Sequence, residues 1–298
     1  MERKQLYELA PQDYEHNFDR ETRNLLEDTA GLDFIISQIN KFGIERILKI
    51  KYTGSYLKIN SKNFPTLYSV LEEACRILAL DKIPDLYVVW SYDINALTAG
   101  VENPIVVVNS GCIDLLSPEE LLFVIGHELG HIKSNHVLYY QMVNLMPLFT
   151  KILGDMTLGI GSTVGVGVQI ALLNWQRMAE LTADRAGLLV CQDINTATTA
   201  LMKMAGLPQK FFNSIVIEDF IAQAKEFQNY DYDTFDLVAK VISTMGQTHP
   251  WTVMRAAELF KWVESGDYNK ILENTGWRSK SLLWQQKHPW KPSFFSNS

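Results

Sequence analysis

The sequence predicts an α+β fold that is mainly helical, with a small antiparallel or mixed sheet and one helix that carries the candidate active site. Two observations predict this class. Apolar residues recur at helical spacing over most of the 298-residue chain, whereas alternating or β-branched runs fall between residues 47 and 109. A hydrophobic content of 47% is typical of a globular protein with a sizeable core.

Three regions are expected along the chain. Residues 1–85 form an N-terminal helical region with a β-hairpin, residues 86–270 form the catalytic domain, and residues 271–298 form a tail without periodicity. The first two regions are expected to pack as a single compact unit.

Composition and charge limit which partners and which cellular compartment are expected. The net charge of -7 gives no basic footprint, so no nucleic-acid partner is expected. Three scattered cysteines predict buried thiols in a reducing compartment rather than a disulfide framework. No apolar stretch follows the basic N-terminus, so no signal peptide is expected. These features predict a cytoplasmic protein, either soluble or membrane-associated.

The secondary structure follows from periodicity and from capping residues. The expected elements are an amphipathic helix pair over 18–42 broken near Gly31, a hairpin of strands 47–52 and 56–60, a helix over 65–80, strands at 86–90 and 105–109, and further helices between 175 and 266. Ser117, Pro118 and Glu120 form a capping box, which predicts a helix from Pro118 to roughly Tyr140.

The sequence HELGH at 127–131 lies within this capped helix. His127 and His131 are four residues apart, so both imidazoles point from one helical face and can bind one metal ion. Glu128 is then beside the ion, where a carboxylate can take a proton from water. The alternative is a pair of hydrogen-bonded helix histidines with an incidental glutamate.

A catalytic zinc needs a third protein ligand and an open fourth position. Glu180 is the candidate ligand, and Asp184 follows one turn later on the same face of a predicted helix. A carboxylate at Asp184 can accept the other ring N–H of a ligating histidine and fix its tautomer. The alternative is an exposed acidic pair on a helix surface.

The combination of HELGH at 127–131, AELTADRAG at 179–187 and THP at 248–250 with Arg255 resembles the HtpX and CAAX prenyl protease family of gluzincin metallopeptidases, over about residues 86–258. The resemblance implies a zincin-type fold with one Zn²⁺ per chain, bound by His127, His131 and Glu180. It also implies that Glu128 is the general base and that Asp184 supports a ligand.

The same resemblance extends to residues near the substrate. It implies that His249 donates to the oxyanion and that Arg255 orients His249 or contacts substrate. The alternative for these two is a helix start at Pro250 with a surface arginine. Asn95 and Val107 lie in stretches that also resemble the family, and residues 105–109 resemble its substrate-aligning edge strand. An ordinary core strand is equally compatible with the sequence.

His136 is excluded from the metal site at this point. It lies five residues after His131, which on an ideal helix rotates it by about 140° from that ligand.

Two uncharged runs, 137–150 and 156–176, separate His131 from Glu180. Their glycines and polar residues favour a soluble helical hairpin beside or over the cleft, with membrane insertion as the alternative. Peripheral membrane contact through 137–173 stays open.

The function expected is a zinc-dependent endopeptidase that cleaves unfolded or membrane-associated polypeptides, in protein quality control. One alternative is a non-hydrolytic, chaperone-like binding factor on a zincin scaffold, which the intact Glu128 disfavours. Another is a gluzincin aminopeptidase, which the absence of a G-x-M-E-N-like stretch before HELGH disfavours.

Overall fold

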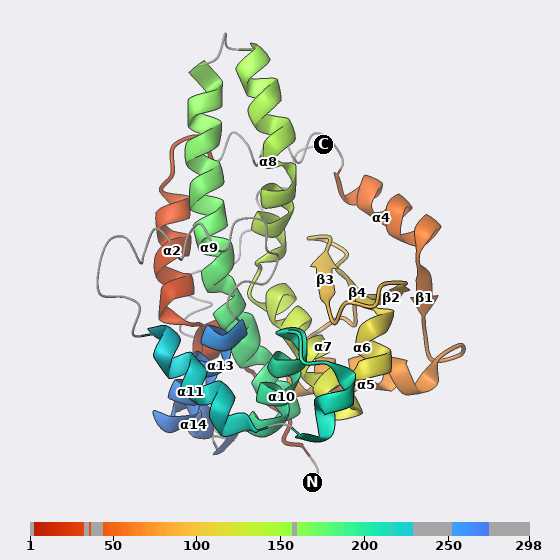
Figure 1. The fold of residues 1–298 in the computed structure, drawn as a ribbon. Coiled ribbons are helices and arrows are strands. Elements are labelled where there is room, and N and C mark those ends of the chain that lie inside the picture. Colours follow the sequence, from red (N-terminus) through yellow and green to blue (C-terminus); the bar gives the residue numbers. More distant parts are fainter. Residues whose placement is uncertain are drawn as a thin grey trace.

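The computed structural model describes residues 3–32, 36, 44–156, 160–214, 216–228 and 252–273, and most of these residues are helical (Figure 1). In chain order the described elements are α1 (Pro11–Tyr14), α2 (Asn17–Glu27), α4 (Ile44–Ser55), β1 (Leu57–Ile59), α5 (Pro65–Ile77), β2 (Asp85–Val89), β3 (Ala96–Ala99), β4 (Ile105–Asn109), α6 (Ser110–Leu115), α7 (Pro118–Lys133), α8 (Val137–Met156), α9 (Ile160–Cys191), α10 (Ile194–Met204), the 3₁₀ helix η1 (Gln209–Ser214), α11 (Ile217–Gln228), α13 (Thr252–Glu264) and α14 (Asp267–Glu273). The expected α+β class, mainly helical, is confirmed.

The described strands form one mixed sheet in the order β1-β2-β4-β3. β2 and β4 are parallel, whereas β1 and β3 flank them as antiparallel strands. Because β4 lies inside the sheet, its apolar side chains are buried on both faces. The interpretation of residues 105–109 as the edge strand is therefore wrong, and the core-strand alternative holds. The strand at this edge of the sheet is β3, which the sequence pattern does not predict.

Residues 47–52 belong to helix α4 rather than to a strand, so the predicted hairpin is wrong. The same alternation also places Leu48 and Tyr52 four residues apart, on one face of a helix. In the structure Tyr52 is buried in a cluster on the sheet, and Leu48 is partly buried against the same cluster. Only the second arm of the hairpin is a strand, where β1 pairs with β2.

Helix α7 begins as the capping box predicts. The Glu120 backbone N–H donates to the Ser117 hydroxyl, and the Ser117 backbone N–H donates to the Glu120 carboxylate at 2.7 Å. The helix ends at Lys133, seven residues before the predicted end. Asn135 has a φ of 58°, a left-handed conformation that asparagine adopts more readily than most residues. This turn separates α7 from α8 and changes the direction of the chain at His136.

The segment between His131 and Glu180 forms a helical hairpin. Helix α8 and the first half of α9 lie side by side and extend away from the sheet (Figure 1). Helix α9 continues to Cys191, so one helix carries both an arm of the hairpin and Glu180. Within the described ranges, no helix is both long and apolar enough to cross a membrane.

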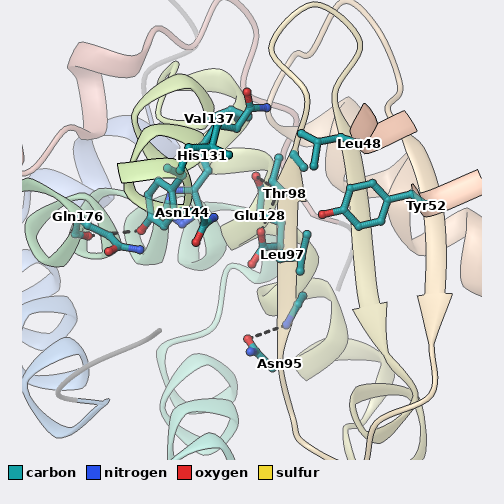
Figure 2. Close-up of a pocket in the computed structure, with 15 residues that line it drawn as sticks. Leu48, Tyr52, Asn95, Leu97, Thr98, Glu128, His131, Val137, Asn144 and Gln176 are labelled. Carbon is teal, nitrogen blue, oxygen red and sulfur yellow. Dashed lines mark hydrogen bonds between the residues drawn. The ribbon is translucent and has the colours of Figure 1, made fainter. Parts of the chain in front are cut away.

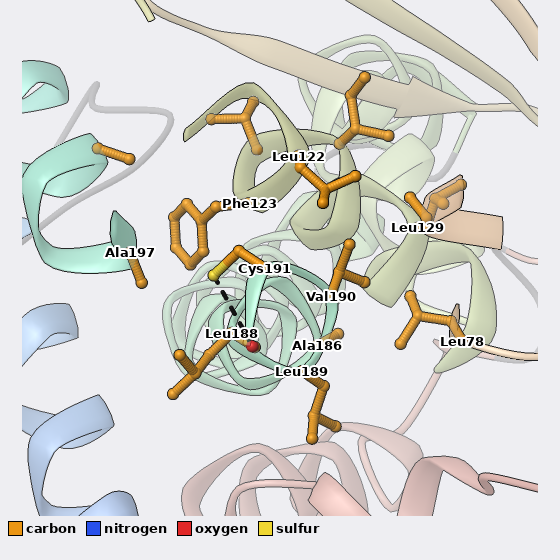
Figure 3. Close-up of a cluster of buried hydrophobic side chains, with 14 of the residues drawn as sticks. Leu78, Leu122, Phe123, Leu129, Ala186, Leu188, Leu189, Val190, Cys191 and Ala197 are labelled. Carbon is orange, nitrogen blue, oxygen red and sulfur yellow. Dashed lines mark hydrogen bonds between the residues drawn. The ribbon is translucent and has the colours of Figure 1, made fainter. Parts of the chain in front are cut away.

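Helices α7 and α9 pack closely in the main core, where Leu122, Phe123 and Leu129 of α7 lie near Val190 of α9 (Figure 3). The approach depends on small residues. A Cβ placed on Gly126 would lie 2.7 Å from the Cβ of Val190, closer than real Cβ atoms come. The two helices therefore meet almost backbone to backbone, which brings the candidate ligands on each of them together.

We expect Gly130→Ala to destabilise the packing of α7 against α9. The added Cβ would lie 2.6 Å from the Cβ of Ala186, and 3.2 Å from the Cα of Ala183, so the helices must separate. Overpacking of this kind costs about 1–3 kcal/mol in the free energy of unfolding, measured by urea denaturation. Gly167→Ala is the matched control, because no described atom lies within 4 Å of its added Cβ.

At Gly167 the same replacement in a helix is expected to raise the free energy of unfolding by about 0.5–1 kcal/mol. Equal stability of the two variants would show that the close approach of α7 and α9 does not depend on the small volume of Gly130.

The rest of the chain surrounds these helices. Helices α1 and α2 pack on α9, and α10 and α13 pack together beside α7 and α9. The cysteines Cys75, Cys112 and Cys191 are buried free thiols, as expected. The division at residues 85 and 270 stays a prediction, and most of the expected tail, from residue 274, lies outside the described residues.

Candidate metal centre

His127 and His131 lie one turn apart on α7, and both side chains are buried. Their Nε2 atoms face each other at 3.2 Å, as the i, i+4 spacing on one helical face predicts. Two imidazole nitrogens this close, in a site with little solvent, offer two ligands to one ion.

Glu180 of α9 supplies a third group opposite the histidines. One carboxylate oxygen lies 3.4 Å from Nε2 of His127, and the other lies 3.4 Å from Nε2 of His131. One ligand atom from each residue falls within 4.8 Å of the other two. Two imidazoles and one carboxylate are a donor set that catalytic zinc takes, with a fourth position left for water. The residues therefore fit a zinc ion.

The orientation of His127 is fixed by Asp184. Its Nδ1 lies 3.0 Å from the Asp184 carboxylate, which only accepts hydrogen bonds, so Nδ1 carries a proton and Nε2 is the nitrogen left to bind a metal ion. Burial lowers the pKa of His127, but hydrogen bonds with Asp184 and Glu180 outweigh burial and raise it to about 9. The buried acids thus make this corner of the site attractive to a cation.

Arg255 of α13 holds Asp184 from the other side. Its guanidinium donates twice to the carboxylate, at 2.7 Å through Nε and at 2.6 Å through a terminal nitrogen. Burial acts to raise the pKa of Asp184, but Arg255 and His127 outweigh it and hold the pKa below its usual range. Arg255 is 2% exposed, so the surface-arginine alternative is wrong.

Tyr140 of α8 contacts the third candidate ligand. Its hydroxyl donates to Glu180, and burial together with the nearby Glu180 charge raises the pKa of the phenol well above its usual value. The phenol therefore stays protonated and acts as a donor. This contact ties the first turns of α8 to the metal centre.

Glu128 is held by the edge strand. The hydroxyl of Thr98 on β3 lies 2.8 Å from the Glu128 carboxylate, and Glu128 is 2% exposed. Both residues line a cavity of about 260 Å³ between β3 and α8, shown in Figure 2. His131 and Asn95 line the same cavity. The candidate base and one candidate ligand thus face a space that substrate can enter.

The comparison with protein families agrees with this geometry. The sequence model of peptidase family M48 matches residues 61–263, more than half of the chain. The chain belongs to peptidase family M48. It is a metallopeptidase, and the expected likeness to HtpX-type zinc metallopeptidases is confirmed.

Several curated relatives show how far the likeness extends. Plastoglobule-localized metallopeptidase 48 of Arabidopsis thaliana is 30% identical over 275 residues, which cover 91% of this chain and 78% of that protein. Protease HtpX homologs of Persephonella marina and Methanocaldococcus jannaschii are 29% and 35% identical, over 47% and 33% of this chain. Those matches cover 56% and 34% of the HtpX homologs. No solved structure matches the chain.

Most of the residues expected from the sequence lie together in the candidate site, and one does not. Val107 does not line the cavity, because it lies on the internal strand β4 and packs in a cluster with Tyr52 and Tyr87. Arg255 faces Asp184 within the protein. His249 lies outside the described residues, so its role stays a prediction.

Three residues of the candidate site were not predicted from the sequence. Thr98 lies on a strand with no clear sequence signal. Tyr140 is the seventh residue past the actual end of α7, in a run assigned to that helix. His136 was excluded on the assumption of an unbroken helix, but after the turn its Nδ1 lies 3.0 Å from Nδ1 of His131. The pair Ser134 and Asn135 was the available signal for that turn.

Proposed function

We propose that this M48 metallopeptidase is a zinc-dependent endopeptidase that binds one Zn²⁺ through His127, His131 and Glu180. The observation that supports the proposal most is the grouping of these three buried side chains within 4.8 Å, beside a glutamate that lines a cavity. A buried set of two histidines and a carboxylate has no comparable use without a cation, because burying unpaired ionisable groups is costly.

Each residue of the site has a role in this proposal. Zinc, when bound, polarises the scissile carbonyl and makes water acidic enough to lose a proton near neutral pH. Glu128 accepts that proton on its carboxylate and returns it to the leaving amine. Thr98 keeps the carboxylate aimed at the cavity through its 2.8 Å hydrogen bond. Asp184 and Arg255 position His127, and His249 is proposed as the oxyanion donor.

The substrate we propose is an extended polypeptide. β3 is the strand at the edge of the sheet beside the cavity, and an edge strand can pair with a peptide backbone with little dependence on sequence. The cavity, at about 260 Å³, is smaller than pockets that enclose a whole small-molecule ligand, about 300–1,000 Å³. It therefore suits a portion of a longer chain, with Asn95 at its border.

We further propose unfolded or membrane-associated polypeptides as the substrates, in protein quality control. Support comes from the hairpin, where Val166 and Ile170 of α9 are 47% and 64% exposed on one helical face. The name of the Arabidopsis relative places that protein at plastoglobules. Peripheral membrane contact through residues 137–173 is part of this proposal, and a cytoplasmic location stays a prediction.

Metal removal tests the proposal. We expect the purified protein to contain one zinc per chain by elemental analysis and to cleave a reduced, unfolded protein at internal bonds. Treatment with 1,10-phenanthroline should abolish cleavage, and one equivalent of Zn²⁺ should restore it. The isomer 1,7-phenanthroline, which does not chelate, is the control.

The products distinguish the alternatives. Mass spectrometry should show internal cuts, whereas stepwise release of single N-terminal residues would identify an aminopeptidase. Binding of the unfolded protein without cleavage by the zinc-loaded enzyme would identify a binding factor. Cleavage at the full rate by zinc-free protein would overturn the metal-dependent mechanism.

A further inference from the structure

An acidic residue in the N-terminal helix lies unusually deep in the protein. Asp19 of α2 has no exposed surface, although α2 lies before the region 61–263 that matches the family model. Helix α2 packs along α9, the helix that carries Glu180. A buried carboxylate is costly unless other groups compensate its charge, so the contacts of Asp19 are informative.

Asp19 is held between a tryptophan and a histidine. The indole N–H of Trp175 on α9 donates to one carboxylate oxygen at 3.0 Å. The other oxygen lies 3.1 Å from Nε2 of His136, within ion-pair distance, although the ring N–H is not aimed squarely at it. Burial raises the pKa of Asp19, but His136 and a hydrogen bond with Thr182 lower it to about 2. Asp19 is therefore ionised, and both of its oxygens can act only as acceptors.

His136 connects this carboxylate to the metal centre. Its ring is fully buried, with Nε2 toward Asp19 and Nδ1 at 3.0 Å from Nδ1 of His131. The other nitrogen of His131, Nε2, faces His127 and Glu180. A continuous series of polar contacts thus runs from α2 through His136 to a candidate zinc ligand.

The protons in this series have one arrangement that permits metal binding. A neutral His131 that binds zinc through Nε2 must carry its proton on Nδ1. That N–H then donates to Nδ1 of His136, which must be an acceptor, so the proton of His136 sits on Nε2 and faces Asp19. The Asp19 carboxylate accepts but cannot donate, and so it favours this arrangement over the reverse one.

We propose that Asp19 is a positioning residue that sets, through His136, the tautomer of His131 and thereby the zinc affinity of the site. The inference rests on the proposed role of His131 as a zinc ligand. It makes the N-terminal helix part of the catalytic unit. At the other histidine ligand, the Asp184 carboxylate contacts His127 directly. Here one additional imidazole, that of His136, lies between the carboxylate and the ligand.

Asp19→Asn provides a directional test, because asparagine has one accepting oxygen and one donating NH₂ group. Trp175 only donates, so it should take the amide oxygen and leave the NH₂ group facing His136. Nε2 of His136 then becomes an acceptor, its Nδ1 carries the proton, and Nδ1 of His131 must accept. The proton of His131 moves to Nε2, where it blocks metal binding.

The measurement is zinc affinity, by competition with a chromophoric chelator. We expect Asp19→Asn to bind Zn²⁺ about 10–100-fold more weakly than wild type. The double variant Asp19→Asn, Trp175→Phe should recover part of this loss, because without the indole donor the amide can turn its oxygen toward His136 while its NH₂ group donates to the Thr182 hydroxyl. Trp175→Phe alone and Glu21→Gln, an exposed acid on α2, should stay close to wild type.

A second readout is the ¹⁵N NMR spectrum of the histidine rings in zinc-free protein. We expect the His131 signals to show protonated Nδ1 in wild type and protonated Nε2 in Asp19→Asn. Urea denaturation of each variant separates this effect from loss of folding.

The outcomes distinguish the two proposals. Wild type without zinc affinity would overturn the proposed function. If wild type binds zinc, equal affinity in Asp19→Asn would overturn the role of Asp19. Equal losses in Asp19→Asn and in the double variant would also overturn it, because a purely structural defect has no reason to be rescued by a second change in the core.

Discussion

Glu128→Gln should abolish most peptide cleavage and leave zinc bound. The amide has nearly the shape of the carboxylate and can still accept the hydrogen bond from Thr98. It cannot take a proton from water, so we expect the kcat for cleavage of an unfolded protein to fall by about 100–10,000-fold. Zinc content should be unchanged, because Glu128 is not one of the three grouped side chains.

The matched control is Glu119→Gln, the same replacement at an exposed position in the first turn of α7. This variant should cleave at the wild-type rate. A Glu128→Gln enzyme that retained wild-type cleavage would show that another group is the base. Loss of zinc from Glu128→Gln would instead show that Glu128 helps to form the metal site.

The core of the candidate site could be predicted because its signals are local. His127, Glu128 and His131 share a single helix with a strong N-terminal cap, so periodicity alone determines how they face one another. Glu180 required an additional inference that two helices distant in sequence meet. The small residues along α7 and α9 permit that meeting, but their sequence does not state which pairs touch.

The parts that were mistaken or missed depend on tertiary contacts. Strand β3 is short and has little β-branched character, and it is a strand because it pairs with β4. Helix α4 was mistaken for a strand because the apolar residues of 47–52 fit both periods. His136 was excluded because a single left-handed residue, Asn135, ends the helix early. In each case a neighbour in space decides between conformations that the local sequence allows.

The continuity of α9 gives the hairpin a direct connection to the metal centre. Glu180 receives the hydrogen bond of Tyr140, which belongs to the other arm. Any change in the angle between the arms therefore acts on a candidate ligand through both helices. We infer that a change at the hairpin can affect the site without touching it.

Arg255→Leu should be among the most destabilising single changes in the protein. Arg255 is 2% exposed and donates two hydrogen bonds to Asp184, and its third nitrogen lies 3.5 Å from Glu180. Its removal takes a compensating positive charge away from two buried carboxylates and leaves His127 beside them. Breaking one partner of a buried ion pair costs about 3–5 kcal/mol, so we expect that loss in the free energy of unfolding of zinc-free protein, by urea denaturation.

The control is Lys261→Gln on the same helix, α13. Lys261 is 54% exposed and pairs with Glu258 across 2.7 Å, so its pair is worth only about 0–1 kcal/mol.

Arg255→Lys separates charge from geometry, because an ammonium restores the positive charge but not the two parallel hydrogen bonds to Asp184. We expect Arg255→Lys to fall between Arg255→Leu and wild type. Similar stability of Arg255→Leu and Lys261→Gln would mean that Asp184 and Glu180 do not depend on the guanidinium for compensation. That result would leave the low pKa of Asp184 to be explained by His127 alone.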